Sequence, residues 1–381
     1  MRIVVNDVAA SKTGALSILK DFYQYVKDHD TENEWVFLLG GNYLAETDRI
    51  RVVLLEDVKK SRLKRLLFEG FSFQKVLKDL KPDVYFSMQN TLPRGYAGKQ
   101  ALYVHQPLGY QNVKRFSLFK KSEREYAIYQ HLIAKLIDAS VKRADLIIVQ
   151  TGWMREAVLA KTHVPKDKVV KILPTIADLS QYAAGVNPSP DTFFYPSGNI
   201  SYKNHSLLYM AAGLLVQRGL TDFKIYVTLT AEELRQHLPQ DADEKILSHF
   251  VCMGRVEREE VLKMYQKSTL VFPSYIETFG YPPAEARQIG TLVLSSDCPF
   301  SREVLDGYEN AYYFDPFDAK VLSDLMEDVI TGKIALKAGK AGAETSAGTE
   351  TSAGMDPAAG TDKDKENSWA QVVELLTALG R

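Results

Sequence analysis

The stretch LVFPSYIETFGYPPAE, residues 270–285, has the pattern of a buried strand followed by a glycine turn and the start of a helix. Its first apolar residues predict the strand, and Gly280 predicts the turn. Pro282 and Pro283 suit the first turn of a helix, where their missing N–H groups need no partner. A strand, turn and helix in this order form the repeating unit of a doubly wound α/β sheet, whose ligands bind beyond the carboxyl ends of the strands.

Two carboxylates, Glu277 and Glu285, bracket this turn. The backbone N–H groups at the start of the helix favour an anion such as a diphosphate. The carboxylates accept hydrogen bonds from hydroxyl groups. A ligand with a diphosphate and neighbouring hydroxyls is a nucleotide-sugar. The alternative is that Glu285 only complements the helix dipole and that Glu277 is an ordinary loop residue.

Short apolar strands alternate with amphipathic segments on both sides of this stretch, which predicts parallel sheets built from βαβ units. We expect strands at 3–5, 35–39, 51–55, 84–86, 101–104 and 146–149, and then at 193–199, 223–229, 249–254, 269–274, 291–296 and 311–316. Two sets of strands predict two doubly wound domains. We place them at residues 1–168 and 169–336.

Residues 337–366 are rich in Ala, Gly, Thr and Ser and contain the near-repeats AETSAG and TETSAG. They have almost no large apolar side chain, so they cannot offset the entropy cost of order, and we expect a low-complexity linker. SWAQVVELLTAL, within residues 367–381, predicts a final helix that packs back toward the first domain.

Composition narrows the class of protein. The chain has 381 residues, 45% of them hydrophobic and 25% charged, which is typical of soluble proteins. Its two cysteines exclude a disulfide scaffold, and the chain has no C-x-x-C motif or Cys/His ligand cluster. We expect no metal and no cofactor. The start, MRIVVND, reads as a strand rather than a signal peptide, and no apolar run is long enough to span a bilayer. We expect a cytoplasmic protein.

Charge is uneven along the chain. Residues 1–165 hold 26 Lys or Arg and 18 Asp or Glu, whereas the rest holds 21 and 30. A basic half joined to an acidic half suggests that the halves have different partners. Nothing in the balance indicates nucleic acid.

The second half of the chain resembles the retaining glycosyltransferases of family 4. ETFGYPPAE matches their E-x7-E motif, SGNISYKNHSLLYMA resembles their phosphate-binding strand, loop and helix, and CMGRVEREEVLKMYQKSTLVFPSYIETFGYPPAEARQIGTLVLSSDCPFSREVL resembles their donor-binding core. The resemblance covers residues 1–335 and 367–381 and is weaker in the first half. It implies the GT-B fold, in which two Rossmann-like domains face each other across a cleft.

The resemblance also implies roles for individual residues. Glu277 would contact hydroxyls of the donor sugar, Glu285 would bind the ribose, and the amides of Phe279, Gly280 and Tyr281 would face the sugar and phosphate. Lys203 would bind the diphosphate after the turn at Gly198. The family usually has an arginine where this chain has Asn199, and Arg255 is a candidate substitute. Without that context, Lys203 would be read as a solvated surface charge.

Three further positions follow from the same resemblance. Gly254, Arg255 and Val256 would contact the nucleotide base, although a plain turn explains Arg255 equally well. Gly14, after the first strand, would approach the donor phosphates; a helix-start turn is the alternative. His105 would lie near the donor sugar at the end of strand 101–104, but most isolated histidines are structural. His105 and Asp7 are the candidates for acceptor activation.

Other patterns are less specific. Asp241-Ala242-Asp243 matches a metal-binding D-x-D pattern, but its context favours an acidic helix start. Residues 59–73 and 114–130 mix cations with Phe, Leu and Tyr, which suits an anionic membrane surface; a solvated helix face is the alternative.

The predicted protein is a retaining, metal-independent glycosyltransferase of the hexosyltransferase type. Glu277, His105 and Lys203 are its candidate catalytic residues. The donor is a nucleoside-diphosphate sugar, and the acceptor is a glycan or a lipid-linked molecule at the inner face of the membrane, in cell-surface polysaccharide synthesis. The alternatives are a catalytically silent sugar-nucleotide-binding scaffold or regulator, and a sugar-nucleotide epimerase.

Overall fold

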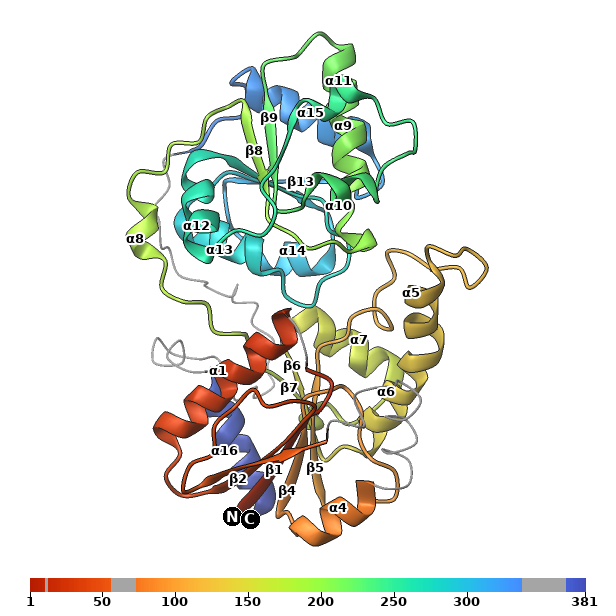
Figure 1. The fold of residues 1–381 in the computed structure, drawn as a ribbon, viewed down its shortest axis with the longest axis vertical. Helices are drawn as coiled ribbons and strands as arrows, with labels where there is room; N and C mark the ends of the chain where they lie inside the picture. Colours follow the sequence, from red (N-terminus) through yellow and green to blue (C-terminus); the bar gives the residue numbers. More distant parts are fainter. Residues whose placement is uncertain (11–12, 56–72, 338–367) are drawn as a thin grey trace, which may run out of the picture. The chain divides into compact units, whose positions relative to one another are not determined.

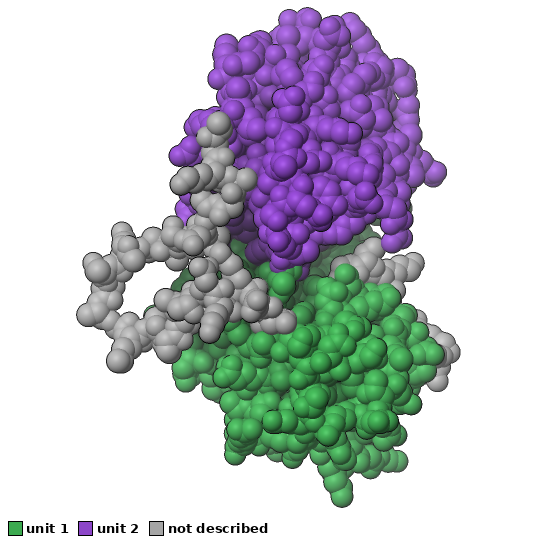
Figure 2. All heavy atoms as spheres, turned by 90° about the vertical axis from the view of Figure 1, so that its left-hand side faces the viewer, with its two compact units in different colours: residues 1–175, 356–381 green, residues 176–355 purple. Residues whose placement is uncertain are grey.

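The computed structural model describes residues 1–10, 13–55, 73–337 and 368–381 (Figure 1). The chain forms two compact units, coloured separately in Figure 2. Unit 1 comprises residues 1–175 and 356–381, and unit 2 comprises residues 176–355. Each unit contains one parallel sheet.

The sheet of unit 1 has seven parallel strands in the order β3-β2-β1-β4-β5-β6-β7. Its strands are β1 (Arg2–Asp7), β2 (Glu34–Leu39), β3 (Ile50–Leu54), β4 (Val84–Ser87), β5 (Lys99–Val104), β6 (Leu146–Val149) and β7 (Val169–Lys171). The order reverses direction between β1 and β4, which is the topological switch point of a doubly wound fold.

Helices cover both faces of this sheet. Successive residues of a strand point to opposite faces, so each face presents apolar side chains that the helices bury. Ile3 and Val5 pack with α1 (Thr13–His29) and α16 (Ser368–Gly380), and Val4 packs on the other face. That second face is covered by α4 (Phe73–Leu80), α6 (Ala134–Arg143) and α7 (Gly152–Thr162). Helix α5 (Arg124–Ile128) continues into α6 through a π-helical turn at Tyr129–Ile133.

The last helix, α16, is part of unit 1 although it follows unit 2 in the sequence. Val372 and Leu376 are fully buried in the core formed with α1 and the sheet. The ring of Trp369 lies 4.9 Å from that of Phe22, centroid to centroid. Apolar burial therefore ties the end of the chain to its beginning.

The sheet of unit 2 has six parallel strands in the order β10-β9-β8-β11-β12-β13. They are β8 (Thr192–Tyr195), β9 (Lys224–Val227), β10 (Phe250–Cys252), β11 (Thr269–Phe272), β12 (Val293–Ser296) and β13 (Ala311–Phe314). Here the switch point lies between β8 and β11, which pair directly.

The helices of unit 2 are α8 (Ser180–Ala183), α9 (His205–Gln217), α10 (Ala231–Arg235), α11 (Glu244–Leu247), α12 (Arg258–Lys267), α13 (Tyr281–Ile289), α14 (Pro299–Val304) and α15 (Ala319–Ile330). Helix α9 packs beside α15 (Figure 1). Arg218, just after α9, joins Asp324 and Glu327 of α15 at 2.7 Å each. Helix α13 lies against β11 and β12.

The structure contains each of the twelve expected strands and one that the sequence pattern did not indicate. Strand β7 pairs with β6, so residues 169–171 belong to the first sheet and not to the second domain, as the expected boundary after residue 168 implied. Unit 1 accordingly continues to Thr175. Most of the basic stretch 59–73 (residues 59–72) and most of the expected linker (residues 338–366) lie outside the described residues. No described helix has the length and apolar character needed to cross a bilayer.

Candidate functional site

The switch point of unit 2 brings two loops of the predicted site together. Strands β8 and β11 are neighbours, with Phe194 paired to Leu270. Because the strands are parallel, the loops that follow them leave the same edge of the sheet. One loop carries Gly198 and Lys203, and the other carries Glu277.

Lys203 ends a 3-10 turn (Ser201–Lys203) directly before α9. The next residue, Asn204, has a φ of 64°, a conformation that asparagine tolerates better than most residues. The side-chain Nδ2 of Asn204 donates to the carbonyl oxygens of Pro273 (3.2 Å) and Pro316 (2.7 Å). The Tyr195 hydroxyl donates to the Lys203 carbonyl at 2.7 Å. The backbone around the lysine is therefore fixed to the ends of three strands.

The side chains of Lys203 and Glu277 form an ion pair through Nζ and Oε1. Each side chain is only 17% exposed. The Ser274 hydroxyl donates to the same carboxylate oxygen at 2.7 Å. A cation and a carboxylate, contributed by the two strands at the switch point, are thus held in contact.

The turn after Glu277 depends on Gly280, whose φ is +91°. A Cβ at this position would come within 3.1 Å of Phe300 Cδ2. Phe279 is buried, with its ring edge-on to that of Tyr281 at 5.2 Å. In the part of the chain that the structure describes, the N–H groups of Phe279 and Gly280 donate to no protein acceptor. These two N–H groups, in the loop after β11, are candidate donors to a ligand.

Glu285, on α13, is 4% exposed. Its Oε1 pairs with Arg258 Nη1 at 2.8 Å, and its Oε2 accepts from the Tyr265 hydroxyl at 3.2 Å. Burial, reinforced by the neighbouring Glu285, raises the pKa of Tyr265 well above its ordinary value, so the tyrosine remains a donor. The carboxylate is oriented from α12, whose first and eighth residues supply both partners.

The loop after β8 differs from the expected phosphate clamp. A Cβ built on Gly198 would meet nothing within 4 Å, so other groups can approach the backbone closely. Asn199, in the place of the usual arginine, is engaged by neighbours: its Oδ1 lies 2.6 Å from His237 Nε2, and its Nδ2 donates to Gln236 at 3.0 Å.

His205, the first residue of α9, lies behind this loop. It is fully buried, with Nε2 2.9 Å from the Ser197 hydroxyl and its ring stacked on that of His237 at 5.1 Å. Burial lowers the pKa of His205 to about 3, with smaller contributions from His237 and Lys203. The imidazole is therefore neutral at neutral pH.

The expected base contact lies on the loop between β10 and α12. Gly254 has a φ of +66°, and its N–H donates to the Leu229 carbonyl at 3.1 Å. Arg255 is exposed and forms no ion pair with any residue in the described ranges, while Val256 is partly buried. The arrangement is compatible with either the functional or the plain-turn interpretation.

In unit 1, His105 follows β5 and is held by Asn90, which follows β4. The Asn90 Oδ1 accepts from the backbone N–H groups of His105 (2.7 Å) and Gln106 (2.9 Å). This orientation leaves Asn90 Nδ2 facing His105 Nε2 at 3.2 Å, so Nε2 accepts. Burial lowers the pKa of His105 to about 4. The neutral ring then carries its proton on Nδ1, which is buried and has no partner among the described residues.

Gly14, the other candidate in unit 1, lies in the first turn of α1, and residues 11–12 before it are outside the described ranges. In unit 2, Asp243 caps α11 by accepting from the Lys245 N–H at 2.8 Å, the helix-start role that its context favours. The described residues hold no group of three or more His, Cys, Asp or Glu suited to a metal.

Sequence reasoning missed four contributors to the site. Ser274 and Asn204 position the Glu277 and Lys203 loops, and Arg258 and Tyr265 hold Glu285. Only Asn204 had a local signal, since asparagine before a helix favours a left-handed or capping conformation. The other three act through contacts between elements, which a spacing pattern does not contain.

Comparison with known proteins places unit 2 in a family. Residues 183–345 match the family model for glycosyl transferases group 1. Over 205 residues the chain is 26% identical to the O-antigen chain mannosyltransferase RfbU of Salmonella typhimurium, covering 51% of this chain and 53% of RfbU. Over 233 residues it is 24% identical to the serotype-specific mannosyltransferase WbdA of Escherichia coli, covering 55% of this chain and 27% of WbdA. The chain thus spans about half or less of these relatives.

The fold has counterparts among solved structures. The apo form of the lipopolysaccharide outer core galactosyltransferase WaaB superposes with a TM-score of 0.58 at 15% identity, covering 88% of this chain and 92% of WaaB. At this identity the likeness concerns the fold. Residues 183–345 thus match the glycosyl transferases group 1 family, and the two parallel α/β sheets of the chain have the GT-B fold.

Proposed function

We propose that this protein is a retaining glycosyltransferase that moves a sugar from a nucleoside-diphosphate sugar to a glycan or lipid-linked acceptor. The observation that carries the proposal is the contact between Lys203 and Glu277 at the switch point of the second sheet. Open α/β sheets bind ligands at this position. The family match of residues 183–345 supports the same interpretation.

Lys203 would bind the diphosphate. It lies at the start of α9, where the helix dipole adds to its charge. As the donor binds, its phosphates would replace Glu277 as the partner of the lysine. The carboxylate, still held by Ser274, would then accept hydrogen bonds from sugar hydroxyls. The ion pair keeps both groups charged and positioned until the donor arrives.

The turn at Phe279 and Gly280 would supply two N–H donors to the sugar or the phosphate. Glu285 would accept from the ribose hydroxyls, with Arg258 and Tyr265 maintaining its orientation. Arg255 and Val256 are proposed contacts of the base, and Gly198 and Gly14 are proposed points of close backbone approach to the phosphates.

The departing diphosphate gains negative charge in the transition state. Lys203 and the N–H groups would stabilise that charge, and prepositioned donors of this kind supply a large share of the rate enhancement in many enzymes. His105 would lie near the donor sugar as a neutral imidazole, because burial lowers its pKa and Asn90 fixes its tautomer. Glu277 and Glu285 both act by holding hydroxyls, so we assign neither as a general acid or base.

The acceptor is proposed from the relatives and from the charge of the chain. WbdA is named as a serotype-specific mannosyltransferase and RfbU as an O-antigen chain mannosyltransferase. We propose a comparable role in cell-surface polysaccharide synthesis, in the cytoplasm at the inner face of the membrane, where the basic first half would favour an anionic surface. A mannose donor is the first to test.

The experiment is a donor panel. The purified chain is incubated with GDP-mannose, UDP-glucose, UDP-galactose and UDP-N-acetylglucosamine, with and without glycan and lipid-linked acceptors, and release of nucleoside diphosphate is measured. We expect release that requires an acceptor for one donor. Conversion of a donor without any acceptor would instead indicate an epimerase.

One observation favours a second candidate, a catalytically silent sugar-nucleotide-binding protein. Asn199 stands where an arginine is usual, so one expected cation is missing. The side-chain amide of Asn199 is engaged by Gln236 and His237. Donor binding in a titration, without release of nucleoside diphosphate in the panel, would support this candidate and contradict the transferase.

A further inference from the structure

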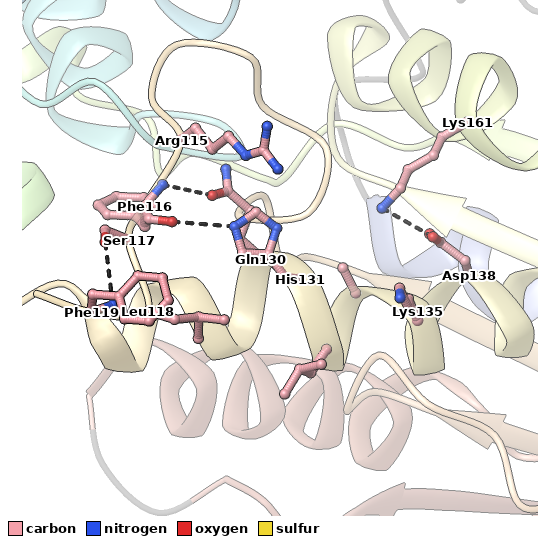
Figure 3. Close-up of a pocket in the computed structure, with 12 residues that line it drawn as sticks. Arg115, Phe116, Ser117, Leu118, Phe119, Gln130, His131, Lys135, Asp138 and Lys161 are labelled. Carbon is pink, nitrogen blue, oxygen red and sulfur yellow. Dashed lines mark hydrogen bonds and ion pairs between the residues drawn. The ribbon is translucent and has the colours of Figure 1, made fainter.

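An apolar rim on unit 1 is exposed to a degree unusual for its residue types. Phe119 is 94% exposed, Leu132 53% and Leu118 42%. All three line one surface pocket of about 660 Å³ (Figure 3). Single exposed apolar residues are common, but three around one pocket indicate an interaction surface.

Hydrogen bonds of residues 116–118 fix the segment that carries Leu118 and Phe119. The Ser117 N–H donates to Glu123 Oε2 at 2.9 Å, and Arg124 Nε donates to the Leu118 carbonyl at 3.2 Å. The Phe116 N–H donates to Gln130 at 2.8 Å, which joins the segment to the helix behind it. These hydrogen bonds therefore fix the backbone in a conformation that leaves Leu118 and Phe119 exposed.

Cations surround the rim. Arg115 and Lys135 line the same pocket, and Lys121 follows Phe119 by two residues. All three are exposed, and none forms an ion pair with another described residue. Residues 111–143 contain eight Lys or Arg and three Asp or Glu. This surface therefore carries positive charge that the described protein does not balance.

Two of the three acidic residues nearby, Glu123 and Asp138, are already paired. Glu123 lies 3.4 Å from Lys114 and 3.8 Å from Lys120, and Asp138, the one acid in the pocket lining, pairs with Lys161 at 3.0 Å (Figure 3). An incoming anion would therefore meet little repulsion. The partner must offer negative charge next to an apolar phase.

We propose that this surface docks on an anionic lipid bilayer, with Phe119 and Leu118 entering the acyl boundary and Arg115, Lys121 and Lys135 binding lipid phosphates. A bilayer offers lipid phosphates at its surface and apolar acyl chains beneath them. The phosphates match the exposed cations, and the acyl chains match the exposed apolar side chains. The inference deepens the proposed function, because it names the surface that would bring a lipid-linked acceptor to unit 1. It rests on residues that the donor site does not use.

Vesicle co-sedimentation tests the proposal. We expect the full chain to bind vesicles of phosphatidylcholine containing about one-third phosphatidylglycerol, to bind pure phosphatidylcholine far less, and to lose affinity as salt rises. Phe119→Ser should lower the partition coefficient at least about tenfold, because it removes a large apolar side chain from the acyl boundary. Lys121→Gln and Lys135→Gln should each lower it about fivefold.

Matched controls separate docking from general changes in polarity and charge. Phe317→Ser removes an aromatic ring that is 54% exposed in unit 2, and Lys78→Gln removes an exposed cation on α4. Both should partition like the unchanged protein. Equal partition of Phe119→Ser and the unchanged protein, or equal binding to charged and uncharged vesicles, would overturn the proposal.

Two readouts distinguish this inference from the proposed function and from other occupants. Donor turnover with a water-soluble acceptor should be the same in Phe119→Ser and the unchanged protein, so failure of turnover in both concerns the transferase alone. Sedimentation velocity without lipid should show no change of mass in Phe119→Ser. Loss of a dimer in that variant would assign the surface to a second copy of the chain and would overturn bilayer docking.

Discussion

At the scale of single residues, the charged groups of the site are already paired or hydrogen-bonded with one another. Lys203 and Glu277 share an ion pair, and Ser274 supports the carboxylate. Leaving a charge partly buried without its partner is costly, so the pair maintains both groups before a ligand binds. The effect of a substitution at Lys203 or Glu277 therefore depends on which partners the other residue of the pair keeps.

Removing the cation should weaken donor binding. In Lys203→Ala, Glu277 keeps its bond from Ser274, but the diphosphate loses a charged donor worth roughly 1.5–3 kcal/mol, or about ten- to 150-fold in affinity. Titration calorimetry with the preferred donor measures the change. Lys320→Ala, which removes an exposed and ion-paired lysine of α15, is the control. Unchanged donor affinity in Lys203→Ala would exclude the lysine from the site.

Buried His205 should make unit 2 sensitive to acid. Its folded pKa of about 3 lies below the ordinary value of 6.5, so between these values the unfolded chain binds more protons. The stability contribution is complete above pH 6.5 and is lost as pH falls toward 3. His205→Phe should reduce the slope of unfolding free energy against pH, between pH 6.5 and 5, by up to about 1.4 kcal/mol per unit.

Urea unfolding at several pH values measures this slope. His29→Phe, which replaces an exposed histidine of α1, is the control and should keep the slope of the unchanged protein. An identical slope in His205→Phe would show that His205 does not cause the acid sensitivity.

At the scale of elements, the site is a set of strand ends and helix starts, and the turn at Gly280 is the most constrained of them. Its positive φ and the approach of Phe300 both disfavour a side chain. The same turn presents the N–H groups of Phe279 and Gly280. Its backbone geometry therefore connects local conformation with ligand binding.

Glycine substitutions separate these contributions. Gly290 also has a positive φ, +96°, but a Cβ there would meet nothing within 4 Å. Gly290→Ala should cost about 1 kcal/mol of stability from backbone strain alone. Gly280→Ala should cost more, because Phe300 must move, and it should also weaken donor binding. Thermal unfolding and donor titration of both variants test this; equal effects would show that the contact with Phe300 is unimportant.

The elements also show what the sequence can and cannot predict. Apolar runs such as WVFLL and TLVFPS became β2 and β11 because strands buried on both faces need continuous apolar residues. Strand β7 was missed because Val169–Lys171 is three residues long and ends in an exposed lysine. Residue types and spacing indicated Glu277 and Lys203, but not their direct contact, nor the hold of Arg258 on Glu285, which arises when separate strands and helices pack.

At the scale of the whole molecule, the chain is built as two units whose stability need not be shared. Helix α16 follows unit 2 in sequence but fills the core of unit 1 with Val372 and Leu376. Apolar burial of this kind stabilises the unit that it enters. The end of the chain should therefore control the stability of the beginning.

A truncation that ends the chain at residue 367 tests this dependence. Loss of α16 exposes the face of the first sheet that Ile3 and Val5 share with α1, so unit 1 should lose several kcal/mol of stability. Hydrogen exchange should show reduced protection in β1 and β4 and unchanged protection in β8 and β11. Equal loss in both sheets would contradict the division into independently stabilised units.

The central claim is that Glu277 and Lys203 hold one sugar-nucleotide, and Glu277→Gln tests it most directly. The amide keeps the shape of the side chain but loses the charge that accepts sugar hydroxyls. Two quantities are measured on one preparation: the rate of acceptor-dependent release of nucleoside diphosphate, and the affinity for free nucleoside diphosphate. We expect the rate to fall about 100-fold or more, while the affinity stays the same or rises because Lys203 is released from its partner. A rate close to that of the unchanged protein would contradict it.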